Sequence, residues 1–154
     1  MNKSIKQINK IYQATKDGDT PEIFHEKCDN VCNTLVLYKT NLNRRFGGFA
    51  SECWNSKGEN ILDKNCFLFS LDKKKIYSSK NNNYYKLSCK ENDGPSFLNG
   101  DYYCIRLEKN ALKNKSLRTT ENKDLFGNDK YPLSEDSKFN GVCAKEYEVL
   151  EIIF

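Results

Sequence analysis

Apolar residues in this chain of 154 residues fall into short clusters separated by polar turns. Four clusters are rich in β-branched and aromatic residues, as strands usually are, and they cover residues 34–38, 66–71, 102–107 and 147–154. Residues 46–54 offer a fifth candidate strand around two adjacent glycines. The connections are mostly short and polar, whereas parallel strands need long crossover connections. The pattern therefore predicts antiparallel pairing.

Two helices are predicted ahead of the first strand. The first has apolar residues at helical spacing, namely Ile5, Ile8, Ile11 and Tyr12. It should end at the turn residues 16–19. The second begins with Thr20, whose hydroxyl can accept hydrogen bonds from open backbone N–H groups, and with Pro21, which suits the first helical position. We therefore expect a single domain over residues 1–154 that opens with a helix and turn over residues 1–18.

One buried core should collect the apolar faces of these elements. Its expected members are Phe24, Leu35, Leu37, Trp54, Phe67, Phe69, Cys104, Ile105 and Ile152. Residues 110–139 contain few apolar side chains, and this segment is predicted to be irregular.

Composition narrows the classes of function. The net charge of +4 is much weaker than the footprint of a dedicated nucleic-acid binder, so no nucleic-acid partner is expected. No segment approaches the roughly 20 apolar residues that cross a bilayer, and the N-terminus lacks the apolar core of a signal peptide. A cytosolic or nuclear protein is therefore predicted, and its seven cysteines are expected to be reduced thiols.

The sharpest chemical constellation lies on the second predicted helix and just after it. His25, the only histidine, precedes Cys28 and Asp29 by one helical turn, so the three side chains share one face, and Cys32 follows. One interpretation is a thiolate paired with an imidazole, with His25 and Cys28 as catalytic candidates, or part of a metal site.

The other interpretation is structural, with Cys28 packed in the core and His25 hydrogen-bonded to a turn. We favour it because a thiol near a helix C-terminus is not activated, and because a second ligand pair at zinc-site spacing is missing. No metal and no cofactor is predicted.

A basic and aromatic segment, residues 72–86, is predicted to be a hairpin. Lys73, Lys74 and Lys75 within it indicate either a patch for an acidic partner or nucleic acid, or a solvated surface, and short charge runs are usually surface. Two glycine-containing motifs, Gly47-Gly48 and Gly94-Pro95-Ser96, lack the lysine and hydroxyl pattern of a phosphate-binding loop. They are interpreted as turn chemistry.

Taken in order, these segments resemble the TLDc domain family. The blocks that carry the resemblance are FHEKCD at 24–29, TLVLYKT at 34–40, FGGFASECW at 46–54, DKNCFLFSL at 63–71, GPSFLNGD at 94–101 and YEVLEIIF at 147–154. The chain departs from the family pattern at Leu98 and Asn99, which stand where the family has glycines, and in the stretch after residue 110.

The resemblance implies an α+β fold, namely a two-sheet antiparallel β-sandwich flanked by short helices. It also implies a non-enzymatic protein-interaction module that binds or regulates the vacuolar-type proton ATPase and is linked to protection against oxidative stress. Two alternatives stay open. One is a lineage-specific structural subunit of a large cytoskeletal, ciliary or membrane-bound assembly, and the other is a thiol-based redox protein. A cytoplasmic location, free or peripheral on such a complex, is expected.

Partner contacts are expected in at least one of four segments, residues 46–49, 72–86, 94–100 and 110–139. In the second of these, Lys73, Lys74 and Lys75 should meet acidic groups. In the motif loops the candidate residues are Phe46, Gly47, Gly48, Gly94, Pro95 and Ser96.

Overall fold

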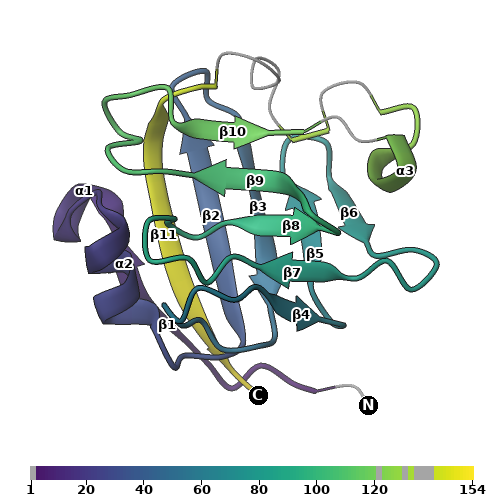
Figure 1. Cartoon of the computed structure of the whole chain (residues 1–154), viewed down its shortest axis with the longest axis horizontal. Coiled ribbons are helices and arrows are strands. Elements are labelled where there is room, and N and C mark those ends of the chain that lie inside the picture. Colours follow the sequence, from purple (N-terminus) through teal and green to yellow (C-terminus); the bar gives the residue numbers. More distant parts are fainter. Residues whose placement is uncertain (1–2, 121–122, 130–131, 134–140) are drawn as a thin grey trace.

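Two antiparallel β-sheets pack face to face, with two short helices at one edge (Figure 1). The computed structural model describes residues 3–120, 123–129, 132–133 and 141–154. Strands of the front sheet run across Figure 1, whereas those of the rear sheet run steeply along it, as in orthogonally packed sandwiches. The predicted α+β sandwich with short helices is confirmed.

The described residues place six strands in the rear sheet and five in the front sheet. The rear sheet has the order β1 (Gln7–Gln13), β11 (Ala144–Ile153), β2 (Thr34–Thr40), β3 (Arg45–Ala50), β5 (Phe67–Ser70) and β6 (Lys75–Ser78). The front sheet has the order β10 (Leu117–Thr119), β9 (Tyr102–Leu107), β8 (Phe97–Asn99), β7 (Tyr85–Leu87) and β4 (Ile61–Asp63). The helices are α1 (Ala14–Asp17), α2 (Pro21–Cys28) and α3 (Lys123–Phe126).

The predicted N-terminal helix is wrong, because its residues form the edge strand β1. This strand pairs antiparallel with β11, and its register shifts between Lys10 and Tyr12. The irregularity breaks the strict alternation of a strand, which is why the apolar spacing looked helical. Ile5 and Ile8 are exposed, whereas Tyr12 is buried and its hydroxyl donates to the Gly18 carbonyl at 2.7 Å.

Helix α2 forms where it was predicted. Thr20 precedes it in extended conformation, and the Thr20 hydroxyl accepts from the backbone N–H of Ile23 at 3.4 Å. Phe24 and Cys28 lie one turn apart on its inner face, and both are fully buried.

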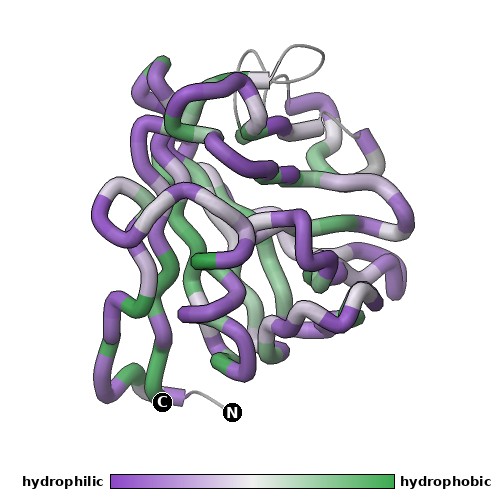
Figure 2. Tube along the Cα trace, turned by 60° about the vertical axis from the view of Figure 1, so that its left-hand side comes forward, coloured by the Kyte–Doolittle hydropathy of each residue, from purple (hydrophilic) through white to green (hydrophobic). Residues whose placement is uncertain are grey.

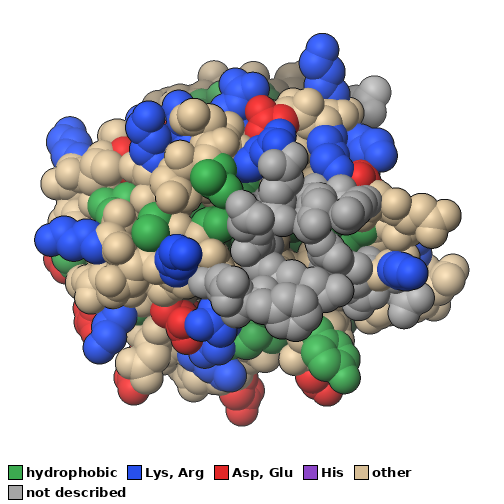
Figure 3. All heavy atoms as spheres, turned by 90° about the horizontal axis from the view of Figure 1, so that it is seen from above, with side chains coloured by type: hydrophobic (Ala, Val, Ile, Leu, Met, Phe, Trp, Pro, Cys, Tyr) green, Lys and Arg blue, Asp and Glu red, His purple; other side chains and the backbone are tan. Residues whose placement is uncertain are grey.

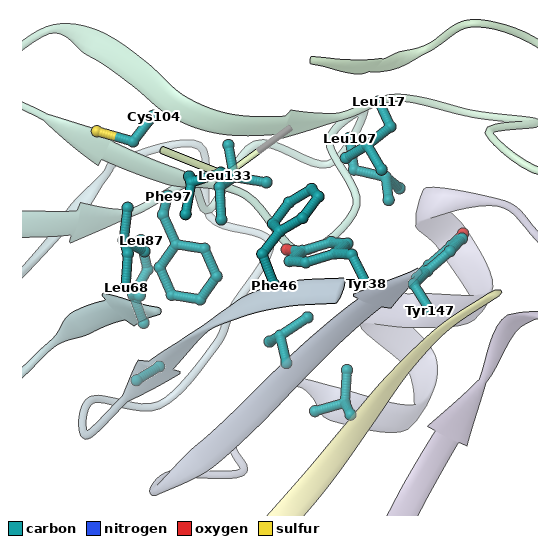
Figure 4. Packing of buried hydrophobic residues seen from close by; sticks show 14 of the residues in the cluster. Tyr38, Phe46, Leu68, Leu87, Phe97, Cys104, Leu107, Leu117, Leu133 and Tyr147 are labelled. Atoms are coloured by element: carbon teal, nitrogen blue, oxygen red, sulfur yellow. The ribbon is translucent and has the colours of Figure 1, made fainter. Parts of the chain in front are cut away.

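The core lies between the two sheets, where hydrophobic stretches of the chain gather (Figure 2). Tyr38, Phe46 and Tyr147 project from the rear sheet toward Phe97 and Leu107 of the front sheet (Figure 4). Tyr38 and Phe46 stack with ring centroids 5.4 Å apart. Of the residues expected in this core, those confirmed are Phe24, Trp54, Cys104 and Ile105.

The alternation of β2 is opposite to the predicted one. Thr34, Val36 and Tyr38 face the core, whereas Leu35 and Leu37 face outward and are half-buried. Phe67 of β5 also faces outward, and Phe69 and Ile152 are buried outside the core cluster. The buried Thr34 hydroxyl accepts from the Trp54 indole at 2.8 Å, so its inward position gives the buried indole N–H a partner.

The glycine pair of β3 lets aromatic rings approach this strand from both sides. A Cβ on Gly48 would lie 2.6 Å from Phe97 Cζ of the front sheet, and a Cβ on Gly47 would lie 2.6 Å from Phe69 Cζ. These distances are far below van der Waals contact, so β3 has no room for side chains at these two positions.

Two further expectations are corrected. Residues 72–86 are not one hairpin, because β6 pairs with β5 in the rear sheet while β7 belongs to the front sheet. Residues 110–139 are not wholly irregular, because they contain β10 and α3. Parts of that segment, residues 121–122, 130–131 and 134–140, lie outside the described residues.

Cys32 and Cys53 form a disulfide, which corrects the expectation that all seven cysteines are reduced. The loops that carry them run side by side. The Asn30 N–H donates to the Trp54 carbonyl at 2.8 Å, and the Trp54 N–H donates to the Val31 carbonyl at 3.3 Å. These backbone bonds, rather than any sequence spacing, bring the two cysteines together.

Candidate functional site

His25 links helix α2 to a distant turn. The ring is buried, and its Nδ1 lies 2.7 Å from Oδ1 of Asp29, one turn further along the chain. Nε2 lies 3.1 Å from the carbonyl oxygens of Lys90 and Asp93. Every polar contact of the ring is thus with an oxygen atom that can accept a hydrogen bond.

The partners of His25 are themselves held by further hydrogen bonds. Asp29 accepts from the Ser56 hydroxyl at 2.8 Å. The buried carboxylate of Asp93 accepts from the hydroxyls of Ser88 at 2.7 Å and Tyr103 at 2.5 Å. The network joins α2, the turn around residue 56 and the front sheet. Its hydrogen bonds therefore stabilise the fold.

Cys28 does not join His25 in a reactive pair. Its side chain is fully buried beneath α2. Burial, assisted by the neighbouring Asp29 carboxylate, raises the pKa of the Cys28 thiol to about 12. Cys32, the fourth member of the predicted constellation, is bonded to Cys53 instead. Within the described part of the chain, His, Cys, Asp and Glu side chains form no group of three or more arranged to hold a metal ion.

The motif residues expected to contact a partner are buried. Phe46, Gly47 and Gly48 lie within β3, inside the rear sheet. The Pro95 carbonyl accepts from the Tyr38 hydroxyl at 2.5 Å, and this contact joins the two sheets.

Ser96 and Gly94 are occupied in a similar way. The Ser96 hydroxyl accepts from the Leu107 N–H at 2.9 Å, and a Cβ on Gly94 would lie 2.5 Å from a Leu107 methyl group. These motif residues contact other parts of the chain, and their contact with a partner stays a prediction.

The lysine cluster at the β5–β6 turn is exposed, as expected, but two of its members are paired within the chain. Lys73 and Lys75 contact the carboxylate of Asp129 at 2.5 and 3.0 Å, and the Tyr77 hydroxyl donates to it at 2.7 Å. Desolvation acts to raise the pKa of Asp129, but these donors outweigh it and lower the pKa to about 2. Lys74 is exposed at the turn itself. Seen from above, Lys and Arg side chains are spread over the surface among a few acidic ones (Figure 3).

A shallow apolar groove lies beside these lysines on the outer face of the rear sheet. We name it the outer groove; it has a volume of about 480 Å³ and is lined by Leu35, Phe67, Phe69, Ser70, Leu71, Lys74, Lys75 and Ile76. Ile76 is 68% exposed and Leu71 is 47% exposed, so these two apolar side chains of the outer groove are open to solvent. Phe67 stacks on Phe49 with centroids 5.3 Å apart, which keeps its ring on this outer face.

Sequence reasoning missed the outer groove, although one signal was present. Residues 67–69 read Phe-Leu-Phe, so β5 is apolar on both faces. Strands with two apolar faces are usually covered on both sides. The outer side of β5 instead opens into the outer groove.

Comparison with protein families gives a match. The family model of the TLDc domain matches residues 1–152. A search of curated proteins finds no match. Among the described residues, the helices are too short and too polar to traverse a bilayer.

Proposed function

This chain belongs to the TLDc domain family, and from that premise we propose that it acts as a protein-interaction module whose partner is the peripheral sector of a vacuolar-type proton ATPase. Family membership supports the choice of partner and a link to oxidative-stress protection. The observation that carries the interaction role is the outer groove, where the apolar side chains of Leu71 and Ile76 are open to solvent.

Catalysis is not part of this proposal. The buried network around His25 uses each of its polar groups to hold loops together. The raised pKa of Cys28 opposes thiolate formation at neutral pH, so the thiol-based redox role is the weaker alternative.

A permanent structural subunit is the second candidate. Obligate interfaces are more hydrophobic than transient ones, and the apolar floor of the outer groove suits either kind. The two differ in how fast the partner leaves. A regulator exchanges, whereas a structural subunit stays bound after dilution.

The test is direct binding to the peripheral sector of a purified vacuolar-type ATPase. The full chain, labelled with a fluorophore at its N-terminus, is sedimented with that sector at micromolar concentration. We expect co-sedimentation that saturates, together with a change in ATP hydrolysis. Absence of co-sedimentation over the whole concentration range would contradict the proposed partner.

A chase experiment separates the two candidates. Unlabelled chain is added in excess to the labelled complex, and the loss of label from the sector is followed. Exchange within minutes supports a regulatory module, whereas retention over hours supports a structural subunit.

A further inference from the structure

The floor of the outer groove offers side chains but no free backbone. β3 and β5 are inner strands of the rear sheet, each hydrogen-bonded to a neighbour on both sides. An extended peptide laid over them would leave its own N–H and C=O groups without partners. A helix satisfies its backbone internally, so it loses nothing by lying on this floor.

The flank of the groove at β6 is not free for the addition of a strand either. β6 is the edge strand, and α3 lies beside it. Tyr77 of β6 packs edge-on against Phe126 of α3 at 4.9 Å between ring centroids. The Tyr77 hydroxyl is bonded to Asp129, so a second set of contacts holds this edge to the chain itself.

The part of the sheet that holds the groove is also wide enough for a helix. From β2 to β6 the sheet advances by three strand spacings, or about 14 Å. An α-helix with its side chains is about 10–12 Å across. Leu35 of β2 and Ile76 of β6 stand at the two sides, and Phe67 and Phe69 of β5 form the floor between them.

Charge defines the occupant further. Lys74 and Lys75 line one end of the groove, and none of its described lining residues is acidic. Lys75 is shared with Asp129 at 3.0 Å, whereas Lys74 is exposed on the turn. A partner that places carboxylates at this end gains attraction, and one that places lysines there is repelled.

We infer that the outer groove receives an amphipathic α-helix of the partner protein, with its apolar stripe on Phe67 and Ile76 and acidic residues beside Lys74 and Lys75. This inference rests on the proposed role as an interaction module. It adds the secondary structure, polarity and charge of the segment that is bound.

The test uses three fluorescent peptides of about 18 residues. The first carries leucines at helical spacing and glutamates elsewhere, and a lactam bridge holds it helical. The second has lysine in place of each glutamate. The third keeps the acidic composition but contains two central prolines, which prevent a helix. Binding to the full chain is measured by fluorescence anisotropy at about 0.1 M and about 0.5 M salt.

Variants locate the site. Ile76→Glu and Lys74→Glu alter the outer groove at exposed positions. Leu62→Glu and Lys57→Glu are matched controls at exposed positions outside its lining, and Leu62 is 47% exposed on β4 of the front sheet. Circular dichroism and thermal unfolding establish that each variant is folded before binding is measured.

We expect the acidic helix to bind at least about 10-fold more tightly than the basic or proline-containing peptide. Ile76→Glu should weaken it by about 10-fold or more, and Lys74→Glu should weaken it and reduce its salt dependence, while both controls stay within about 2-fold. Equal binding of the basic or the broken peptide would overturn the inference. So would insensitivity to Ile76→Glu, self-association through this face, or preferential binding to anionic lipid vesicles.

The same variants distinguish this inference from the proposed function. If the wild-type chain and Ile76→Glu bind the ATPase sector equally, the groove inference fails while the proposed partner stands. If the acidic helix binds the groove but the ATPase sector does not bind the chain, the groove inference stands and the proposed partner fails.

Discussion

The imidazole of His25 joins two segments of this protein that are distant in sequence. His25 bonds at both ring nitrogens and joins α2 to the turn that contains Lys90 and Asp93. Its neighbours along the helix face have separate tasks, because Cys28 packs in the core and Asp29 reaches Ser56. In the cluster that looked catalytic in the sequence, His25 and Asp29 contact each other and two separate turns, whereas Cys28 packs in the core.

The five free cysteines, all within the described residues, should react at very different rates. Four are buried, namely Cys28, Cys66, Cys89 and Cys104, whereas Cys143 is half-buried. Burial raises the pKa of Cys28 and of Cys104 to about 12, which removes nearly all thiolate at neutral pH. Brief labelling of the native chain with iodoacetamide, followed by peptide mass spectrometry, should find the label on Cys143. Rapid labelling of Cys28 would instead favour the redox alternative.

Asp129 should make stability depend on acid pH. Its pKa is about 2 in the folded chain, below the ordinary 3.8. A lowered folded pKa means that the stabilisation is complete above about pH 4 and is lost as the pH falls toward 2. Urea unfolding of Asp129→Asn at pH 7, 4 and 2.5 should therefore show a flatter acid dependence than the parent chain.

The matched control for that measurement is Asp101→Asn. The Asp101 side chain is 97% exposed. Its removal should leave the acid dependence unchanged. An Asp129→Asn variant with the parent's acid dependence would show that the lysine and tyrosine contacts do not stabilise the fold.

At the scale of elements, the close approach of Phe97 to Gly48 of β3 leads to a specific prediction. Alanine usually suits a strand better than glycine, but a Cβ at position 48 would lie 2.6 Å from Phe97 Cζ and 3.0 Å from a Leu68 methyl group. Gly48→Ala should therefore lower the free energy of unfolding by about 1–3 kcal/mol, as overpacked cores do. Chemical denaturation measures this.

Relief of the clash provides the control. Phe97→Leu replaces the ring that meets position 48 with a smaller side chain. The double variant Gly48→Ala/Phe97→Leu should therefore lose less free energy of unfolding than the two single variants added together. Strict additivity would show that Phe97 does not limit the space at β3.

Periodicity predicted the long strands better than it predicted their faces. β9 occupies the predicted residues, and β2, β3, β5 and β11 lie close to theirs. The facing of β2 was wrong because Leu35 and Leu37 are as apolar as Val36 and Tyr38. When both faces of a strand are apolar, the alternation of residue types does not indicate which face is buried. Pairing with the neighbouring strands then decides it.

The short strands could not be predicted from pattern. β4, β7, β8 and β10 have three residues each. Three residues contain too little alternation to distinguish a strand from a loop. Pairing with a neighbour makes them strands, and pairing is a property of the folded chain.

Part of the candidate site could likewise be predicted from the sequence, and part could not. A hydrogen bond from His25 to a turn followed from local chemistry, and the structure places one there. The outer groove combines Leu35 with Phe67 and Ile76, residues from three separate strands. Sheet order brings them together, so reasoning over short windows of sequence had no access to the groove.

For the whole molecule, the C-terminal strand is an organising element. β11 lies between β1 and β2 and pairs with both. It contributes Tyr147 and Val149 to the core, both almost wholly inaccessible to solvent. The N-terminal and C-terminal parts of the chain must meet before this sheet is complete, so contacts of long sequence separation dominate folding.

Removal of residues 144–154 should therefore prevent folding altogether. The shortened chain would lose three core side chains, those of Ala144, Tyr147 and Val149, and leave β1 without its only strand partner within the described residues. We expect poor dispersion in its amide NMR spectrum and no cooperative thermal transition. Deletion of Phe154 alone is the control, and it should leave a cooperative transition. A folded chain without β11 would contradict the central place given to this strand.

The pairing of β1 with β11 also decides how the molecule bears tension. Gln7 lies opposite Ile153, and the Lys6 N–H donates to the Ile153 carbonyl at 2.8 Å, so the start of β1 lies beside the C-terminal end of the chain. Both lie at the bottom of Figure 1. A force that draws the ends apart loads the rungs of this antiparallel ladder one after another rather than together. In an optical trap, β1 should peel away at low force while the rest of the sandwich holds. Tension applied between residue 58, in the turn before β4, and either end should meet much greater resistance.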